Sequence, residues 1–347
     1  METFIVIPCL NEQESLSATC TSLGFGQGAD PIGRLVLVDN GSTDGTLAVM
    51  SRIQAESPPK RVLIIQEPRR GYVSARRAGM SAVLEQARVE HLSADETLVF
   101  QADADTVYLQ GYVEAMVAAS SGKRGELLEG SALSNREFNT KFSEFAQLCR
   151  EVDTSTECWF APEDEQVVVD DKVCAFLLAD YCKWGEHQDD FDPVGRQVFA
   201  ETTRLFIRAK RNGPAWRKRV EDAQALPSRR KLMTQGLGYF ASSGFPRDAA
   251  WIAGWGEADE ALRFLNSPRT MPTLLRLVRS RQRHQLALFG LLPALCNPEV
   301  AAPSEIAAIA DELREASVGM SPGELLSQML SLADDEQGAI SEILGQR

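Results

Sequence analysis

Short apolar runs alternate with amphipathic segments along the first third of the chain. The apolar runs lie at residues 3–8, 34–39, 62–65 and 97–100. Continuous apolar runs of this length are typical of strands that are buried on both faces of a sheet. Because segments with helical character separate these runs, the pattern predicts an α/β fold with a mostly parallel sheet and helices on both faces.

The segment after the first apolar run shows the helical pattern clearly. Leu16, Cys20 and Leu23 recur at positions i, i+4 and i+7, which places them on one face of a helix. Asn11 comes before this face, and Glu14 lies three residues after Asn11, as in a variant of the capping box. The sequence therefore predicts a helix with Asn11 at its N-cap.

The last third of the chain has a different pattern and a different charge. Residues 273–292 are expected to form one helix, and residues 301–347 carry nine acids against two arginines. A chain of this length exceeds the usual size of one domain, so a main domain with an appendage is expected. The predicted boundaries are 1–265 for the main domain, with halves 1–115 and 116–265, and 266–347 for a helical C-terminal region.

The composition excludes some classes of function. The chain has 347 residues and a net charge of −13, whereas a general nucleic-acid binder would need a basic surface. Its seven cysteines include no Cys-x-x-Cys pair, and an odd number suits a disulfide framework poorly. We therefore expect reduced thiols and a cytoplasmic protein. The sequence also shows no signal peptide and no uncharged stretch long enough to span a membrane.

The main chemical signal is a pair of carboxylates directly after the fourth apolar run. Asp103 and Asp105 lie one residue apart at the expected end of a strand. In an open α/β sheet, ligands bind at the carboxyl ends of the strands. Closely spaced carboxylates there suit a hard divalent cation whose other ligand is a phosphate. The pair therefore predicts Mg²⁺ or Mn²⁺ together with a phosphate-bearing ligand.

Four loops should meet at this edge of the sheet, and together they resemble a known family. They are residues 8–12, 38–46, 70–79 and 101–105. In this order and spacing they resemble family 2 glycosyltransferases of the GT-A fold, which is Rossmann-like. The resemblance is clear over residues 1–115, weaker to Lys231, and lost in the C-terminal third.

The resemblance implies that residues 1–115 bind a nucleotide-diphosphate sugar, with a UDP-sugar favoured, and that residues 116–265 form the acceptor half. Asp39 would accept a hydrogen bond from the base, and Arg76 would lie near the diphosphate. Two positions depart from the family pattern, since Cys9 stands where an aromatic residue is frequent and Arg77 where Asn is frequent. The implied donor-site residues are Pro8, Asn11, Glu12, Asp39, Asn40, Arg76, Arg77, Asp103 and Arg230, and the implied metal ligands are Asp105 and Asp103.

The chain departs from the family at the catalytic base, because the family's residue is missing. An inverting transferase needs a carboxylate that accepts the proton of the acceptor hydroxyl. In the family this is the Asp of a Glu-Asp pair at the start of a helix, but here the pair reads Glu201-Thr202. Glu201 is the predicted base, and Asp190, in an acidic cluster with Asp189 and Asp192, is the reserve.

The resemblance implies a metal-assisted, inverting transfer of a sugar to an acceptor hydroxyl. The Gln-x-x-Arg-Trp signature of processive synthases is absent, which favours a single, hexosyltransferase-like transfer. The missing aspartate leaves open a degenerate member that only binds a nucleotide sugar. A sugar-phosphate nucleotidyltransferase is a further alternative, although residues 8–12 lack the expected glycines. The C-terminal helices could pack on the main domain or form a homodimer.

Overall fold

The fold is described by a computed structural model that covers residues 1–28, 30–192, 194–256 and 258–345. The chain divides into two compact units, and each is discontinuous in sequence. The first unit comprises Met1–Leu133, Val169–Asp189 and Glu201–Pro227, and the second comprises Ser134–Val168, Asp190–Ala200 and Ser228–Arg347. The predicted domains are continuous segments, and their boundaries stay a prediction.

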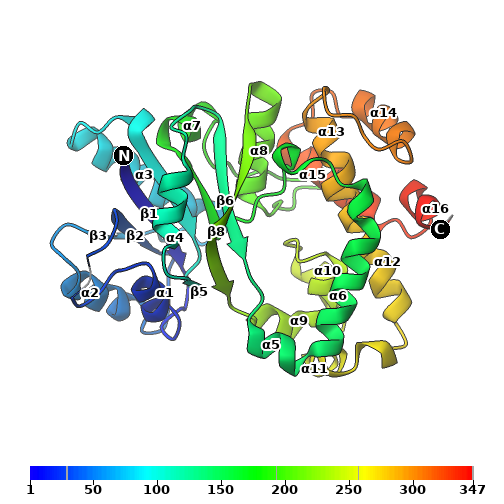
Figure 1. The fold of residues 1–347 in the computed structure, drawn as a ribbon, viewed down its shortest axis with the longest axis horizontal. Coiled ribbons are helices and arrows are strands. Elements are labelled where there is room, and N and C mark those ends of the chain that lie inside the picture. Colours follow the sequence, from blue (N-terminus) through cyan, green and yellow to red (C-terminus); the bar gives the residue numbers. More distant parts are fainter. Residues whose placement is uncertain (29, 193, 257, 346–347) are drawn as a thin grey trace. The chain divides into compact units, whose positions relative to one another are not determined.

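The described residues of the first unit contain one sheet of eight strands, in the order β3-β2-β1-β4-β7-β6-β8-β5 (Figure 1). The strands are β1 (Glu2–Cys9), β2 (Arg34–Asp39), β3 (Val62–Gln66), β4 (Thr97–Ala102), β5 (Thr106–Tyr108), β6 (Glu126–Ala132), β7 (Val173–Leu177) and β8 (Trp216–Pro227). The helices are α1 (Leu16–Ser22), α2 (Thr46–Glu56), α3 (Tyr72–Val89), η1 (Ala94–Glu96), α4 (Tyr112–Ala119), α7 (Leu178–Lys183) and α8 (Glu201–Asn212).

The predicted α/β class is confirmed, but the sheet is mixed rather than mostly parallel. Strands β3, β2, β1 and β4 run parallel, and they correspond to the four apolar runs of the sequence. Strand β7 pairs antiparallel with both β4 and β6. Strand β6 is parallel to β8, and β5 is antiparallel to β8. An apolar run shows that a strand is buried but does not show its direction.

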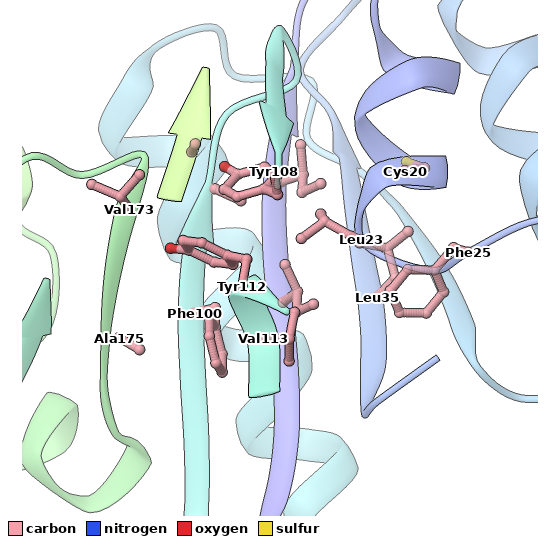
Figure 2. Packing of buried hydrophobic residues seen from close by; sticks show 14 of the residues in the cluster. Cys20, Leu23, Phe25, Leu35, Phe100, Tyr108, Tyr112, Val113, Val173 and Ala175 are labelled. Atoms are coloured by element: carbon pink, nitrogen blue, oxygen red, sulfur yellow. The ribbon is translucent and has the colours of Figure 1, made fainter. Parts of the chain in front are cut away.

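Helices cover both faces of the parallel strands, which explains their continuous apolar character. On one face, Ile5 and Ile7 of β1 belong to a buried cluster that includes side chains of α1, α2 and α4, part of which is seen in Figure 2. On the other face, Val6 and Val38 lie against Gly79 of α3. Successive residues of a strand point to opposite faces, so a strand between two helical layers needs apolar residues at every position.

The second unit is helical in its described residues and has a core of its own. Its aromatic centre contains Phe145, Phe240 and Phe264, whose rings contact one another. The elements are α5 (Arg136–Lys141), α6 (Ser143–Thr156), η2 (Glu157–Trp159), η3 (Glu163–Glu165), α9 (Arg230–Ala241), α10 (Ala249–Ala253), α11 (Ala258–Asn266), η4 (Pro268–Thr270), α12 (Leu274–Gln285), η5 (Leu286–Leu291), α13 (Leu292–Cys296), α14 (Ala307–Ala316), α15 (Pro322–Asp334) and α16 (Ala339–Gly345).

The helix predicted at residues 273–292 is present with a change of winding. It comprises α12 and continues into η5, a π-helical turn, before α13 begins. Helix α12 packs with α6 and α9 of the same unit, as Figure 1 shows for α12 and α6, and α15 and α16 pack with α12. Among the described residues, none of the helices has the length and apolar character needed to cross a membrane.

Candidate active site

The loops that follow β1 and β2 are joined by hydrogen bonds around Asn11. Helix α1 begins at Leu16 with Ser15 as its N-cap residue, so the predicted N-cap at Asn11 is wrong. Asn11 instead has a φ of 57°, a left-handed conformation that asparagine tolerates. Its Oδ1 accepts a hydrogen bond from the N–H of Thr43 at 2.8 Å, and its own N–H donates to the hydroxyl of Ser42 at 3.1 Å.

Hydrogen bonds of Asn40 connect the loop after β2 to the loop after β3. Its side chain is buried, and Nδ2 donates to two main-chain carbonyls of the second loop at 3.0 and 2.8 Å. Its Oδ1 accepts from the N–H of Gly71 at 2.9 Å. The adjacent Asp39 closes its own turn, because Oδ1 accepts from the N–H of Ser42 at 3.1 Å. Asp39 and Asn40 therefore shape the edge of the sheet where the resemblance places the nucleoside.

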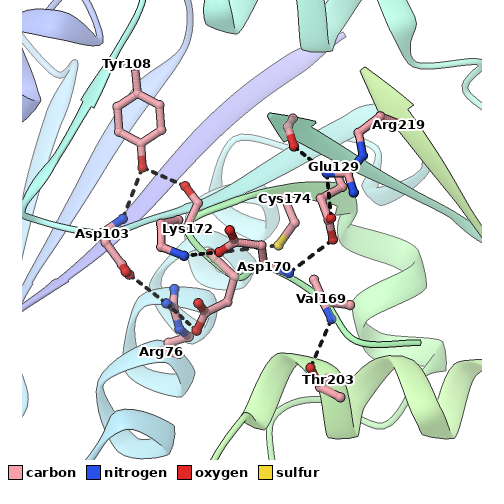
Figure 3. A network of polar contacts seen from close by, with 12 residues as sticks. Arg76, Asp103, Tyr108, Glu129, Val169, Asp170, Lys172, Cys174, Thr203 and Arg219 are labelled. Carbon is pink, nitrogen blue, oxygen red and sulfur yellow. Dashed lines mark hydrogen bonds and ion pairs between the residues drawn. The ribbon is translucent and has the colours of Figure 1, made fainter. Parts of the chain in front are cut away.

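Arg76 of α3 is the centre of a buried cluster of carboxylates (Figure 3). Its Nε donates to Glu201 Oε1 at 2.9 Å. Its Nη2 donates to Asp103 Oδ1 at 3.0 Å and to Asp171 Oδ2 at 2.9 Å. Its Nη1 is buried and has no hydrogen-bond partner in the part of the chain that the structure describes. A buried donor without an acceptor is costly, so Nη1 is a natural contact for a bound anion.

Residues 170–172, Asp-Asp-Lys, complete this cluster (Figure 3) and are not among the predicted site residues. The register of the sheet explains why they are there, since Ala102 of β4 pairs with Val173 of β7 in antiparallel orientation. The residues before Val173 therefore lie beside the residues after Ala102. A signal was present, because two acids and a lysine directly precede an apolar run. This signal predicts that residues 170–172 lie beside Asp103 only when the antiparallel direction of β7 is known.

Burial and mutual charge set the electrostatics of the cluster. Burial alone lowers the pKa of Arg76, but Asp171, Asp103 and Glu201 raise it more, so its pKa lies above the ordinary value and it is charged. Burial, followed by the charge of Asp171, raises the pKa of Asp103 to about 6. Burial also raises the pKa of Glu201, against the opposing effect of Arg76. The cluster has more carboxylates than basic groups, because Arg76 and Lys172 lie with Asp103, Asp170, Asp171 and Glu201, and this excess of acids favours a bound cation.

The carboxylates that follow β4 fit the predicted metal. Asp103 and Asp105 are both partly exposed, and carboxylate oxygens are the hard ligands that Mg²⁺ and Mn²⁺ prefer. Among the described residues, no three side chains of His, Cys, Asp or Glu are grouped so that they could hold a metal ion. Asp103 and Asp105 would supply two ligands. This suits a cation that keeps waters and binds through one or two carboxylates and a substrate phosphate.

Thr202, at the position of the family's catalytic aspartate, belongs to a buried neutral network. Its Oγ1 donates to Gln101 Oε1 at 2.8 Å. Nε2 of Gln101 lies 3.2 Å from Nε2 of His187, and Nδ1 of His187 lies 3.3 Å from the hydroxyl of Tyr181. Burial lowers the pKa of His187 well below its ordinary value, so the imidazole is neutral. At the position of the family's catalytic aspartate, this chain therefore has neutral side chains that make polar contacts with one another.

The other predicted residues of the first unit lie in the loops at the same edge. Pro8 pairs with Val38 near the end of β1. The N–H of Glu12 donates to the hydroxyl of Thr46 at 2.8 Å. Arg77 is partly exposed, and its Nη2 lies 3.7 Å from the carboxylate of Asp189. Arg77 therefore contacts a surface carboxylate rather than the cluster around the neighbouring arginine.

Two predicted residues, Asp190 and Arg230, belong to the second unit. The carbonyl of Asp190 accepts a hydrogen bond from the N–H of Val198 at 2.9 Å, and Asp190 packs against Gly323 of α15. Arg230 is exposed at the first position of α9. The structure thus brings Arg76, Asp103 and Glu201 together in one cluster, while the roles of Asp190 and Arg230 stay predictions.

Residues 4–124 match the family described as Glycosyl transferase family 2. The predicted resemblance to family 2 glycosyltransferases is confirmed for this segment. The matched segment contains the strands β1 to β4 and the loops that carry Asp39, Arg76 and Asp103.

Similarity to curated proteins is also confined to a part of the chain. An uncharacterized glycosyltransferase of Mycobacterium tuberculosis (strain ATCC 25618 / H37Rv) is 41% identical over 78 residues, which are 22% of this chain and 30% of that protein. The succinoglycan biosynthesis protein ExoA of Rhizobium meliloti (strain 1021) is 34% identical over 116 residues, which are 33% of this chain and 31% of that protein. The match thus spans less than a third of the length of either relative.

Two solved structures are similar over more of the chain at low identity. TarS residues 1–349 of S. aureus, in complex with UDP-GlcNAc, has a TM-score of 0.46 and 13% identity, covering 83% of this chain and 73% of that one. The mannosyltransferase PcManGT of Pyrobaculum calidifontis, in complex with GDP-Man and Mn²⁺, has a TM-score of 0.46 and 15% identity, covering 100% of this chain and 88% of that one.

Proposed function

We propose that this chain transfers a sugar from a nucleotide-diphosphate sugar to a hydroxyl group of an acceptor. A UDP-sugar is the favoured donor, and the transfer is metal-assisted and inverts the anomeric configuration. The observation that carries the proposal is the cluster around Arg76. This buried arginine lies within the segment that matches the glycosyltransferase family, binds three carboxylates, and has a buried N–H group with no partner in the described chain.

The cluster offers what a diphosphate and its metal need. The planar guanidinium of Arg76 would donate from Nη1 to a phosphate oxygen, and its other nitrogen atoms stay fixed by Glu201, Asp103 and Asp171. Bound at Asp103 and Asp105, Mg²⁺ or Mn²⁺ would act as a Lewis acid that offsets the charge of the departing nucleoside diphosphate. Of these two carboxylates, Asp103 accepts a hydrogen bond from Arg76 at 3.0 Å.

The chemical step requires one proton acceptor from the protein. A carboxylate takes the proton of the acceptor hydroxyl while the hydroxyl oxygen forms a bond to the anomeric carbon. The bond from that carbon to the diphosphate oxygen breaks, and its electron pair leaves with the nucleoside diphosphate. Because the oxygen attacks from the opposite face, the anomeric configuration is inverted.

Glu201 is the proposed base, and the structure adds Asp171 as a second candidate. The side chain of Glu201 is 5% exposed, whereas that of Asp171 is 33% exposed, and both bind Arg76. The exposed carboxylate is easier for an acceptor to reach, while the buried one has a raised pKa that suits a base. Substitution by the amide removes the basic oxygen and keeps the shape of the side chain.

The base is tested by comparing Glu201→Gln, Asp171→Asn and Asp190→Asn in single-turnover transfer. The variant that lacks the base should lose at least about 100-fold in rate with donor affinity retained, whereas the other two should lose less than about tenfold. Full activity in all three would show that none of these carboxylates is the base.

A thermal-shift panel of UDP, GDP, dTDP, CMP and ADP, each with and without Mn²⁺, tests the donor site. A ligand that binds only the folded chain raises its melting temperature by mass action. The proposal predicts the largest shift for UDP and a dependence of that shift on Mn²⁺. If none of the nucleotides shifts the melting temperature, there is no donor site of the proposed kind.

The metal assignment is tested by Asp105→Asn, with Asp222→Asn as the matched control. Asp222 is exposed on β8 of the same unit, so its amide variant should behave as the wild type. Asp105→Asn should remove the Mn²⁺-dependent part of the UDP shift and lower transfer by at least about 100-fold, because one of two protein ligands is lost. Unchanged Mn²⁺ dependence would contradict the assignment.

A degenerate member that binds the donor without transfer is the second candidate, and the network around Thr202 favours it. A threonine whose hydroxyl donates to Gln101 at 2.8 Å in a buried site cannot accept a proton from an acceptor. Slow hydrolysis of a UDP-sugar by the wild type, lost in Asp105→Asn, would exclude this candidate. UDP binding without any turnover would support it.

The expectations of a cytoplasmic location and of a homodimer through the C-terminal helices remain proposals. None of the seven cysteines, all of which the structure describes, forms a disulfide, which agrees with a reducing compartment. Sedimentation equilibrium of the wild-type chain would test the dimer.

A further inference from the structure

The second unit contains a cavity of about 450 Å³ whose lining includes none of the proposed donor-site residues, metal ligands or candidate bases. It is formed by α5, α6, α9 and α12, which lie together within this unit (Figure 1). Phe138, Phe145 and Tyr239 contribute rings to its lining. This volume is in the range of pockets that bind small organic molecules.

The charged residues of the lining all have the same sign. The described residues that line the cavity include Arg150, Arg229 and Arg281 and no Asp or Glu. The whole chain has a net charge of −13, so a positive cavity is a local exception. Arginine among aromatic rings combines a positive charge with apolar contact area, which suits an anion that has an apolar body.

The three arginines have different surroundings. Arg281 is largely buried and is held by a bidentate ion pair with Asp153, at 2.6 and 2.9 Å. Arg150 is exposed on α6. Arg229 is partly buried, with its guanidinium 5.7 Å from the centroid of the Phe138 ring, and burial lowers its pKa. Arg281 thus belongs to the wall, and Arg229 and Arg150 line the same cavity.

We propose that this cavity is a binding site for a small organic anion that carries an aromatic or aliphatic body. The body would contact Phe138, Phe145 and Tyr239, and the anionic group, a carboxylate, phosphate or sulfonate, would face Arg229 and Arg150. Cys149 also lines the cavity, and burial raises the pKa of its thiol to about 11, so it adds a neutral contact. The proposal does not depend on the transferase activity.

The test uses a fluorescent anion and its neutral analogue on the full chain. Anilinonaphthalene sulfonate carries a sulfonate on an aromatic body, and N-phenylnaphthylamine has the same body without the charge. The sulfonate should bind at one site per chain. Arg229→Gln should weaken it by about tenfold or more, the loss of one charge-assisted contact, and should change the affinity for the neutral probe by less than about threefold.

Two further variants and a control locate the probe. Ala146→Trp, which fills the cavity, should abolish binding of both probes. Arg263→Gln replaces an arginine of α11 in the same unit whose side chain is 67% exposed, and it should change nothing. If Arg229→Gln fails to fold, Arg150→Gln carries the charge test, because its side chain is exposed.

Three results would overturn the proposal. Unchanged sulfonate binding in Ala146→Trp would place the probe elsewhere. Equal affinity for the charged and neutral probes would show an apolar cavity without a preference for anions. Displacement of the sulfonate by saturating UDP with Mn²⁺ would show that the probe occupies the donor site. The last result would leave the transferase proposal intact, whereas a failure of the nucleotide panel would leave the cavity proposal intact.

Discussion

Arg76 and Arg77 are neighbours on α3, but their surroundings differ. The side chain of Arg76 is 5% exposed and binds three carboxylates, whereas that of Arg77 is 38% exposed and has an ion pair at 3.7 Å. Arg76→Gln should lower the free energy of unfolding by about 3 kcal/mol or more, because it leaves the buried Glu201 and two partly exposed carboxylates without their cation. Arg77→Gln, the matched control, should change it by less than about 1 kcal/mol.

Urea unfolding followed by circular dichroism measures both arginine variants. Equal effects would show that the cluster contributes no more than a surface ion pair. A loss in Arg76→Gln that UDP and Mn²⁺ fully restore would also contradict the interpretation, since the loss is attributed to the carboxylates of the protein.

At the scale of elements, the sequence predicted four strands and the helices between them, because their burial on both faces leaves continuous apolar runs. It could not predict that β7 enters the sheet antiparallel, since an apolar run has no direction. Asp103, which follows a predicted strand, was therefore identified, and Asp171, which precedes β7, was not. The pair between Arg76 and Glu201 joins residues 125 positions apart, and only the family resemblance indicated that Arg76 mattered.

The contact between α3 and the sheet depends on Gly79. A Cβ atom at this position would lie 2.3 Å from Cγ1 of Val6 and 3.1 Å from Cγ2 of Val38. Replacing glycine by alanine within a helix normally stabilises it by up to about 1 kcal/mol, but overpacking a buried contact costs about 1–3 kcal/mol. Gly79→Ala is therefore expected to lower the stability of the chain.

Gly238 of α9 is the control for this prediction. The nearest atoms to a Cβ there lie at 3.5 and 3.6 Å, which is ordinary contact, so Gly238→Ala should be neutral or stabilising. Thermal unfolding of the two variants and the wild type measures the difference. A higher melting temperature for Gly79→Ala than for the wild type would show that α3 can move away from the sheet without loss.

At the scale of the whole molecule, histidine protonation provides the clearest dependence of stability on mildly acidic pH. The chain has three histidines. Two of them, His187 and His284, are buried, and burial lowers the pKa of both. His187 belongs to the first unit and His284 to the second, so histidine protonation on unfolding lowers the stability of both units at acidic pH.

The hydrogen bonds of His284 stabilise the neutral form of its imidazole. Its Nδ1–H donates to the carbonyl of Ser280 at 2.9 Å, which leaves the lone pair of Nε2 to accept from Arg247 Nη1 at 2.6 Å. Burial and the charge of Arg247 lower the pKa of His284 to about 4, although Asp334 opposes the effect. Protonation of Nε2 would place two positive groups in contact.

The last prediction concerns stability between pH 7 and pH 5. The unfolded chain protonates this histidine near its ordinary pKa of about 6.5, whereas the folded chain does so only near 4. The stabilisation is therefore fully present above pH 6.5 and is lost as the pH falls towards 4, by about 2 kcal/mol at pH 5.

His284→Asn removes the titrating group, so the difference in free energy of unfolding between wild type and variant should shrink by that amount from pH 7 to pH 5. His91→Asn, at an exposed histidine, should keep the pH dependence of the wild type. Parallel pH profiles for wild type and His284→Asn would show that this imidazole is protonated as easily in the folded chain as in the unfolded one.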